Sequence, residues 1–301
     1  MENNIVEKII KLKKEKNAVI LAHNYVTMDV QNVADFVGDS LALAQKAKTV
    51  EADLIVFCGV RFMGETAKLL NPETKVVLAN KNAGCPMADM ITADQLKDFK
   101  AEHPNSTVMC YVNSSIEVKA ESDICCTSSN AVKIAKSIPE DKTILFVPDK
   151  NLGTYVAQQT KHKVIVWDGF CPVHNNNFSK IDVEKVRKNF PDYKLLVHPE
   201  SLPEVFNKAD IVGSTKGMAD YSEENNKIII GTEVGLLRQL EAKYPEKKFA
   251  ALSEKAICVD MKKNTLKDVL NSLENETDEI IIDAEIAKRA LKSIEAMLEL
   301  S

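Results

Sequence analysis

Three of the seven cysteines recur at nearly equal intervals along the chain. Cys85, Cys171 and Cys258 are separated by 86 and 87 residues, and each follows an apolar run that is typical of a buried strand. A single cysteine is most often a small core residue, but equal spacing in three repeats favours a shared site. The other four lie in strand-like runs without this register, and we expect them in the core: Cys58, Cys110, Cys125 and Cys126.

Three thiolates at one site indicate a metal centre. Zinc could take them with a fourth ligand, but structural zinc favours local ligand pairs on tight loops, and the sequence contains no CxxC pair. A [4Fe-4S] cluster usually takes four cysteines, so three would leave one iron open as a Lewis acid for substrate. The spacing therefore favours an iron–sulfur cluster, with zinc as the alternative.

Three polar pairs, each after a strand-like run, are expected to begin helices. They are Asp39–Ser40, Thr127–Ser128 and Ser214–Thr215. A Ser or Thr at such a position is commonly an ordinary helix N-cap. Three caps that converge on one cavity would instead bind an anion, which predicts a small polyanionic substrate.

The first strand of each repeat ends in residues suited to proton transfer or hydrogen bonding. They are His23, Tyr25, Tyr111, Asn113, His198 and Glu200. A structural hydrogen-bonding role is the alternative for any one of them, but their equivalent places in three repeats favour a functional role. His174 follows Cys171 closely enough to support that ligand at most, whereas His103 and His162 are expected to be exposed to solvent.

The elements that must position these side chains follow an alternating pattern. Short β-branched runs such as residues 18–23, 54–59 and 75–80 alternate with helical patterns that begin at Ser40, near Gly64 and at Ala93. This alternation predicts βα units and parallel sheets. Ligands of open parallel sheets bind beyond the carboxyl ends of the strands, where the three spaced cysteines, the polar pairs and the residues that end the first strands are expected.

Internal repetition divides the chain into three units. Asp35, Asp123 and Asp210 begin similar motifs that lie 88 and 87 residues apart, which matches the cysteine period. We therefore expect an α/β fold of three homologous αβα units with small parallel sheets, pseudo-threefold symmetric around a central cluster site. The predicted units are residues 1–90, 91–175 and 176–260, and residues 261–301 form a C-terminal segment that packs on them. The amphipathic terminal helices are given no chemical role.

Composition excludes several classes of protein. The chain has 301 residues, of which 45% are hydrophobic, so it can fill real cores. Its net charge is −5, which offers no general attraction for nucleic acid or an anionic membrane. The charged N-terminal residues lack the apolar core of a signal peptide, and no apolar run approaches a membrane span. We expect a cytoplasmic protein that binds neither nucleic acid nor membranes.

Several motifs resemble those of one enzyme family. They include LAHNYVTMDVQNVADFVGDSLALA, CGVRFMGETAKLL, GCPMADM, YVNSS, CTSSNA, PDKNLG, WDGFCPVHNN, HPES, GSTKGM and GTEVGLL. Together and in this order they resemble the quinolinate synthases, the NadA family of NAD biosynthesis. The resemblance runs nearly end to end, with only about the first 15 and the last 40 residues uninformative.

This resemblance implies a reaction and a set of site residues. It implies three analogous domains around a [4Fe-4S] cluster on Cys85, Cys171 and Cys258, and condensation of iminoaspartate with dihydroxyacetone phosphate to quinolinate, with loss of phosphate and two waters. An iminoaspartate-producing enzyme is the expected partner. The resemblance implies substrate binding by His23, Ser40, Asn113, Ser128, Ser214 and Thr215, and catalytic roles for Tyr25, Glu200, His198 and Tyr111, with Tyr25 and Glu200 as the acid/base pair.

Two other functions share parts of this pattern. A three-domain reductase of the hydroxymethylbutenyl diphosphate type also resembles the layout of three cysteines and an open cluster, but it needs an electron donor and a richer diphosphate pocket. A non-catalytic iron or oxygen sensor would use the cluster only to report redox state. A sensor should carry a partner surface or a DNA-binding module, and the sequence shows neither.

Overall fold

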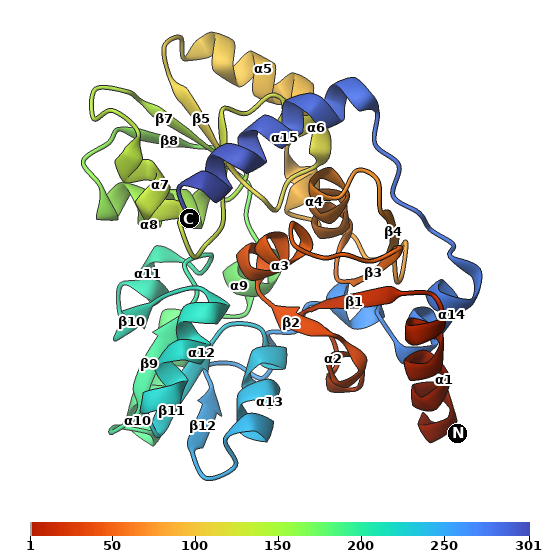
Figure 1. Cartoon of the computed structure of the whole chain (residues 1–301). Helices are drawn as coiled ribbons and strands as arrows, with labels where there is room; N and C mark the ends of the chain where they lie inside the picture. The colour runs from red at the N-terminus through yellow and green to blue at the C-terminus, as the bar shows by residue number, and fades with distance from the viewer. Residues whose placement is uncertain (1) are drawn as a thin grey trace.

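A computed structural model describes residues 2–301 as an α/β protein with three separate parallel sheets of four strands each (Figure 1). The strand orders are β2-β1-β3-β4, β6-β5-β7-β8 and β10-β9-β11-β12, so the three sheets share one topology. The strands are β1 Ala18–His23, β2 Phe36–Gly38, β3 Leu54–Cys58, β4 Lys75–Leu78, β5 Thr107–Tyr111, β6 Ile124–Cys126, β7 Ile144–Val147, β8 Val164–Val166, β9 Lys194–Val197, β10 Ile211–Val212, β11 Lys227–Gly231 and β12 Lys248–Ala251. The predicted α/β class, with a small parallel sheet in each of three units, is confirmed.

Helices follow most of the strands, and two long ones lie near the chain ends. They are α1 Glu2–Glu15, α2 Met28–Val33, α3 Ser40–Ala47, α4 Arg61–Leu70, α5 Ala93–Glu102, α6 Ile116–Ala120, α7 Ala131–Ser137, α8 Lys150–Gln159, α9 Pro172–Asn176, α10 Lys180–Asn189, α11 Pro203–Phe206, α12 Thr215–Glu224, α13 Val234–Lys243, α14 Leu266–Asn275 and α15 Ala284–Glu299. Short 3₁₀ turns span Ala88–Met90 and Met261–Lys263. In Figure 1 the short helix α9 lies near the centre of the view, between the regions that hold the three sheets.

Continuous apolar runs form the central strands of the sheets. Every residue of β3 is buried, and so is every residue of β7. A strand covered by helices on both faces has no polar side, which is why these segments are uninterrupted rather than alternating. The outer strands β2, β6 and β10 have only two or three residues. Such short segments give little periodic signal in the sequence.

The third sheet separates two apolar clusters. In β11, Ile228 and Ile230 pack in the main cluster, which also contains the cores of the first two sheets. Ile229 points the other way, into a smaller cluster with Leu195 and Phe178. Successive side chains of a strand point to opposite faces of the sheet. This single run of three isoleucines therefore contributes to both apolar clusters.

The C-terminal residues attach to the first two sheets. Helix α14 packs on α1 and β3, and α15 packs on α6 and β6. Between these helices the chain makes a short antiparallel bridge with the edge of β4, in which the Leu78 N–H donates to the Asp278 carbonyl at 3.1 Å and the Ile280 N–H to that of Val76 at 2.8 Å. This segment therefore covers an open sheet edge.

Within residues 2–301, none of the helices combines the length and apolar character needed to cross a membrane.

Candidate active site

One cavity of about 210 Å³ gathers residues from the carboxyl ends of strands in all three sheets. Twelve of the thirteen residues predicted from the sequence line it: His23, Tyr25, Ser40, Cys85, Tyr111, Asn113, Ser128, Cys171, His198, Glu200, Thr215 and Cys258. The exception is Ser214, whose hydroxyl accepts the Gly217 N–H at 3.1 Å as the N-cap of α12. The cavity lies where parallel sheets commonly bind ligands.

The three cysteine loops are attached to the sheets by equivalent hydrogen bonds. In each unit, the first residue of the helix after the third strand donates its backbone N–H to the carbonyl two residues before the cysteine. The pairs are Arg61 to Ala83 at 2.9 Å, Lys150 to Gly169 at 2.8 Å and Val234 to Ala256 at 2.9 Å. The same local geometry thus places Cys85, Cys171 and Cys258.

Each thiol faces the start of a short helical turn. Backbone N–H groups three residues further along, at Ala88, His174 and Met261, are directed at the three sulfurs. All three cysteines are half-buried free thiols. Burial raises the pKa of Cys85 to about 12 and that of Cys258 to about 11, and it raises the pKa of Cys171 as well. A metal that binds them must therefore displace their protons.

The three thiols are spaced more widely than the ligand atoms of a single metal ion. Among the described residues, one compact group of metal-binding side chains occurs, Cys171, His174 and Glu200, whose ligand atoms lie within 4.8 Å of one another. The three thiols do not form such a group. Tetrahedral zinc with Zn–S bonds of about 2.3 Å would bring its sulfurs to about 3.8 Å from one another. The donor set of three spaced thiols therefore fits an iron–sulfur cluster better than zinc.

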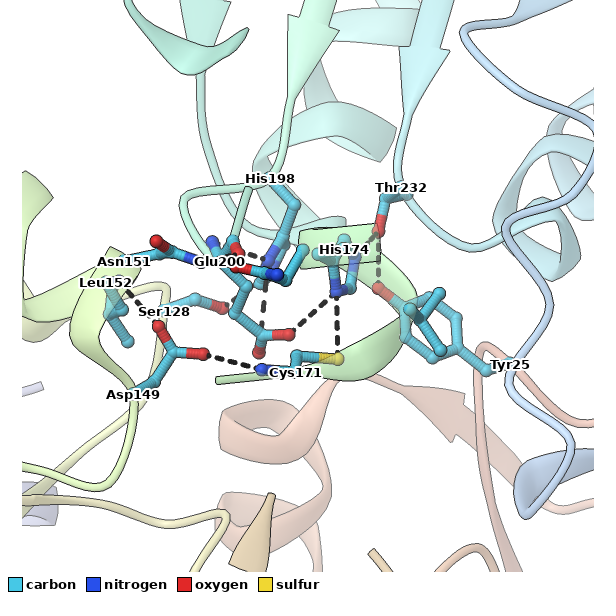
Figure 2. Close-up of polar contacts among 12 residues, drawn as sticks. Tyr25, Ser128, Asp149, Asn151, Leu152, Cys171, His174, His198, Glu200 and Thr232 are labelled. Atoms are coloured by element: carbon cyan, nitrogen blue, oxygen red, sulfur yellow. Dashed lines mark hydrogen bonds and ion pairs between the residues drawn. The ribbon is translucent and has the colours of Figure 1, made fainter. Parts of the chain in front are cut away.

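A chain of hydrogen bonds crosses the cavity from Tyr25 to Tyr111, and Figure 2 shows the part between Tyr25 and Glu200. The Tyr25 hydroxyl lies 2.6 Å from the Thr232 hydroxyl, which lies 2.8 Å from His174 Nε2. On its other side, His174 Nδ1 lies 2.7 Å from Glu200 Oε2. The Tyr111 hydroxyl donates to Glu200 Oε1 at 2.5 Å. Five side chains thus form one continuous network.

The pKa values of the two phenols and of the carboxyl group in this network are shifted in opposite directions. Burial, and then the Glu200 charge, raise the pKa of both Tyr25 and Tyr111 well above the ordinary value, so both phenols keep their protons. Burial works against ionisation of Glu200, but the facing His174 and the hydrogen bonds from His174 and Tyr111 hold its pKa below the usual range. The network therefore has proton donors at the phenols and an acceptor at the carboxylate.

His23 and His198 are neutral hydrogen-bond donors. Each accepts, at Nδ1, the backbone N–H of the residue two positions later: Tyr25 at 3.1 Å and Glu200 at 3.4 Å. Burial lowers the pKa of each imidazole to about 3. The remaining ring proton is therefore on Nε2, and in His198 this atom lies 3.1 Å from the Ser128 hydroxyl.

The predicted ring of three Ser or Thr helix caps is wrong in two units. Asp39, not Ser40, caps α3 and accepts the Ala42 N–H at 2.8 Å. In the second unit, Ser128 lies in a turn and α7 begins at Ala131, because the Asn130 side chain instead accepts the Thr127 N–H at 2.7 Å. Helix dipoles therefore contribute less to an anion site than expected.

Two residues in and beside this site were not expected from the sequence, and a third, His174, has more contacts than expected. Thr232 and His174 complete the network, and Asp149 is fully buried beside Cys171. His174 was expected only to support a ligand, and its nitrogen does lie 3.3 Å from Cys171 Sγ. The signal available was the repeat itself, since Thr232 directly follows the third strand of its sheet. His162, expected at the surface, is buried with Nε2 2.9 Å from the Ile138 carbonyl.

Four core cysteines behave as predicted. Cys58, Cys110, Cys125 and Cys126 lie in β3, β5 and β6 and have no exposed surface.

Comparisons with known proteins point to one enzyme family. Residues 7–299 match the model of the family described as "Quinolinate synthetase A protein". The chain is 53% identical to the quinolinate synthase of Alkaliphilus metalliredigens, over 99% of both chains. It is 49% identical to that of Clostridium acetobutylicum over 99% of both chains, and 47% identical to that of Prosthecochloris aestuarii over 99% of this chain and 94% of the relative.

Proposed function

The chain belongs to the quinolinate synthetase A family, and from this premise we propose that it condenses iminoaspartate with dihydroxyacetone phosphate to give quinolinate, phosphate and two waters. Its relatives are enzymes named quinolinate synthase. The observation that carries the proposal is the meeting of three spaced thiols and a hydrogen-bonded acid/base network in one cavity. Family membership favours this reaction over the reductase and the sensor.

In this proposal, Cys85, Cys171 and Cys258 hold a [4Fe-4S] cluster. When bound, the cluster supplies an iron with an open position that acts as a Lewis acid toward the carboxylate, nitrogen or hydroxyl of a ligand. The charge of the cavity supports this assignment. Among the described residues no Lys or Arg lines the cavity, while Asp39, Glu200 and Asp260 do. Basic side chains of the cavity therefore do not bind the anionic substrates, which leaves this role to uncharged hydrogen-bond donors and to the Lewis-acidic iron that the cluster would supply.

Uncharged donors and acceptors bind the substrates. His23 and His198 present Nε2–H groups, and Ser40, Ser128 and Thr215 add hydroxyls. The Asn113 Oδ1 atom is buried and has no hydrogen-bond partner within the part of the chain described, so it is available to a substrate N–H or O–H. A buried polar atom without a partner is costly, which supports a ligand at this position.

The network from Tyr25 to Tyr111 moves protons during isomerisation, Schiff-base formation and dehydration. Tyr25 donates a proton from its hydroxyl, and Glu200 accepts one at its carboxylate. His174 and Thr232 lie between them and hold both groups in a fixed geometry. A proton taken at one end can therefore be returned through the other without solvent.

The proposal also covers the arrangement of the three units, the location of the protein and the source of its first substrate. Residues 1–90, 91–175 and 176–260 form homologous units around the cluster with approximate threefold symmetry, and residues 261–301 pack on them. The shared strand order supports this division. The free thiols suit the reducing cytoplasm. An iminoaspartate-producing enzyme supplies the first substrate and is functionally coupled to this protein.

The decisive experiment is an assay of the protein purified and reconstituted with iron and sulfide under anaerobic conditions. Quinolinate should form from iminoaspartate and dihydroxyacetone phosphate, and one phosphate should be released for each quinolinate. Omitting either substrate is the control. Cluster-loaded protein that forms no quinolinate, or that reduces an allylic diphosphate with an added electron donor, would contradict the proposal.

A further inference from the structure

The residues that cap the helix after the third strand differ among the three units. These N-caps are Val60 for α4, Asp149 for α8 and Glu233 for α13. They occupy equivalent positions, because the next residue in each case donates its N–H to the loop of the cysteine. Two of the three are fully buried acids that have no place in the proton network.

Asp149 binds a helix and a cysteine at once. Its Oδ1 atom accepts the Leu152 N–H of α8 at 2.7 Å, and its Oδ2 atom accepts the backbone N–H of Cys171 at 3.2 Å (Figure 2). The side chain has no exposed surface. Each oxygen thus satisfies a different buried donor.

Glu233 repeats this arrangement in the third unit. Its Oε2 atom accepts the Gly235 N–H of α13 at 2.6 Å, and its Oε1 atom accepts the backbone N–H of Cys258 at 3.2 Å. Lys262 Nζ lies 2.9 Å from Oε1 and adds an ion pair. The Glu233 side chain is also fully buried, and each of its two oxygens accepts a backbone hydrogen bond.

Among side chains of this size, only a carboxylate has two terminal oxygens that can each accept a hydrogen bond. An amide in the same place would turn its NH₂ toward one of the two N–H donors and leave that donor unpaired. The first unit has no acceptor at Val60. There, Asp260 from the third unit accepts the N–H of Gly84, next to Cys85, at 3.3 Å.

We infer that Asp149 and Glu233 are positioning residues that hold the Cys171 and Cys258 loops, through the cysteine N–H groups, in the geometry that binds the cluster. The inference rests on the proposed cluster but concerns residues outside its ligand set. Loop order before cluster binding lowers the entropic cost of binding, and loss of the bond leaves a buried N–H unpaired. These acids should therefore control how firmly the cluster is retained.

The test compares Asp149→Asn and Glu233→Gln with Asp283→Asn in the reconstituted full-length protein. Asp283 caps α15, but its Oδ1 atom alone accepts both the Glu285 and Ile286 N–H groups, so an amide can replace it. The measurements are the rate of cluster bleaching by an iron chelator and the midpoint potential of the cluster. Asp149→Asn and Glu233→Gln should both bleach on the order of 10-fold faster than wild type and shift the potential, while the control does neither.

Three results would overturn the inference. The first is wild-type bleaching and potential in both variants, and the second is equally fast bleaching in Asp283→Asn, which would indicate general destabilisation. The third is that Glu233→Asp, which keeps both carboxylate oxygens, bleaches as fast as Glu233→Gln. If one variant does not fold, the other carries the test. A wild-type protein without a cluster spectrum would instead contradict the proposed function itself.

Discussion

At the scale of single residues, the two members of the proposed acid/base pair do not contact each other directly. Tyr25 and Glu200 come from different sheets and communicate through Thr232 and His174. Each hydroxyl and carboxyl oxygen in this network has a buried partner, which fixes the positions of the reacting groups before substrate binds.

Tyr25→Phe tests the donor end of the network. The change removes the hydroxyl bound to Thr232 but keeps the ring, which packs edge-on to His23. We expect kcat to fall about 10²–10⁴-fold with the cluster spectrum and KM nearly unchanged. Steady-state kinetics with cluster absorbance measure this, and Tyr155→Phe is the control because that ring packs on Phe206 outside the cavity. A normal kcat with a raised KM would make Tyr25 a substrate-binding residue only.

Thr232 offers a test of the network's continuity. Thr232→Val keeps the shape of the side chain and removes the hydroxyl between Tyr25 and His174, whereas Thr232→Ser keeps the hydroxyl. We expect the valine variant to lose on the order of 10-fold in kcat and the serine variant to recover most of it. If both variants turn over at the wild-type rate, protons do not pass through Thr232.

The neutral state of His23 has a consequence for stability. Its imidazole stays unprotonated down to a pKa of about 3 in the folded protein, against 6.5 in an unfolded chain. Between these values the unfolded chain binds more protons, so stability falls as the pH falls. From pH 7 to pH 5 this residue should cost about 1–2 kcal/mol of the free energy of unfolding.

Urea titration of the cluster-free protein measures that loss. His23→Asn keeps an acceptor for the Tyr25 N–H but does not titrate, so its free energy of unfolding should decline less over the same interval. Parallel declines in the two proteins would show that His23 is not the buried neutral group described here.

At the scale of elements, a serine that caps a helix can be distinguished from a serine that is proposed to bind substrate. Ser214→Ala removes the N-cap of α12 and should lower the free energy of unfolding by about 1 kcal/mol with little change in KM. Ser128→Ala leaves every helix cap intact but removes a hydroxyl from the cavity. It should weaken the binding free energy of the triose phosphate by about 1–3 kcal/mol, which appears as a raised KM. Equal kinetic effects of the two changes would restore the expectation that both serines bind substrate.

The elements also show how far the sequence could predict the fold. Long buried runs such as β3 and β7 were identifiable because a strand covered on both faces is continuously apolar. Helix α7 begins three residues later than predicted because residues 128–130 form a turn, in which the Asn130 side chain accepts the Thr127 N–H instead of capping the helix. Such local competition leaves no periodic signal.

At the scale of the whole molecule, a repeat of about 87 residues predicted the meeting of distant residues. It brought the cysteines and strand-end residues to one cavity without any knowledge of packing between the units. The same repeat could place Thr232 at the end of the third strand of its sheet, but not reveal its role, because its partners Tyr25 and His174 come from the other two units. Contacts between units depend on how they pack, which a periodic pattern does not encode.

The central claim is that three equivalent cysteines, and no others, hold the cluster. The most direct test measures iron, sulfide and visible absorbance after anaerobic reconstitution of Cys85→Ala, Cys171→Ala, Cys258→Ala and the core control Cys58→Ala. Because two thiolates hold a cluster poorly, each of the first three variants should lose the brown absorbance and bound iron, while Cys58→Ala retains both at the wild-type level. A cluster that survives loss of Cys171 and disappears with Cys58 would contradict the account.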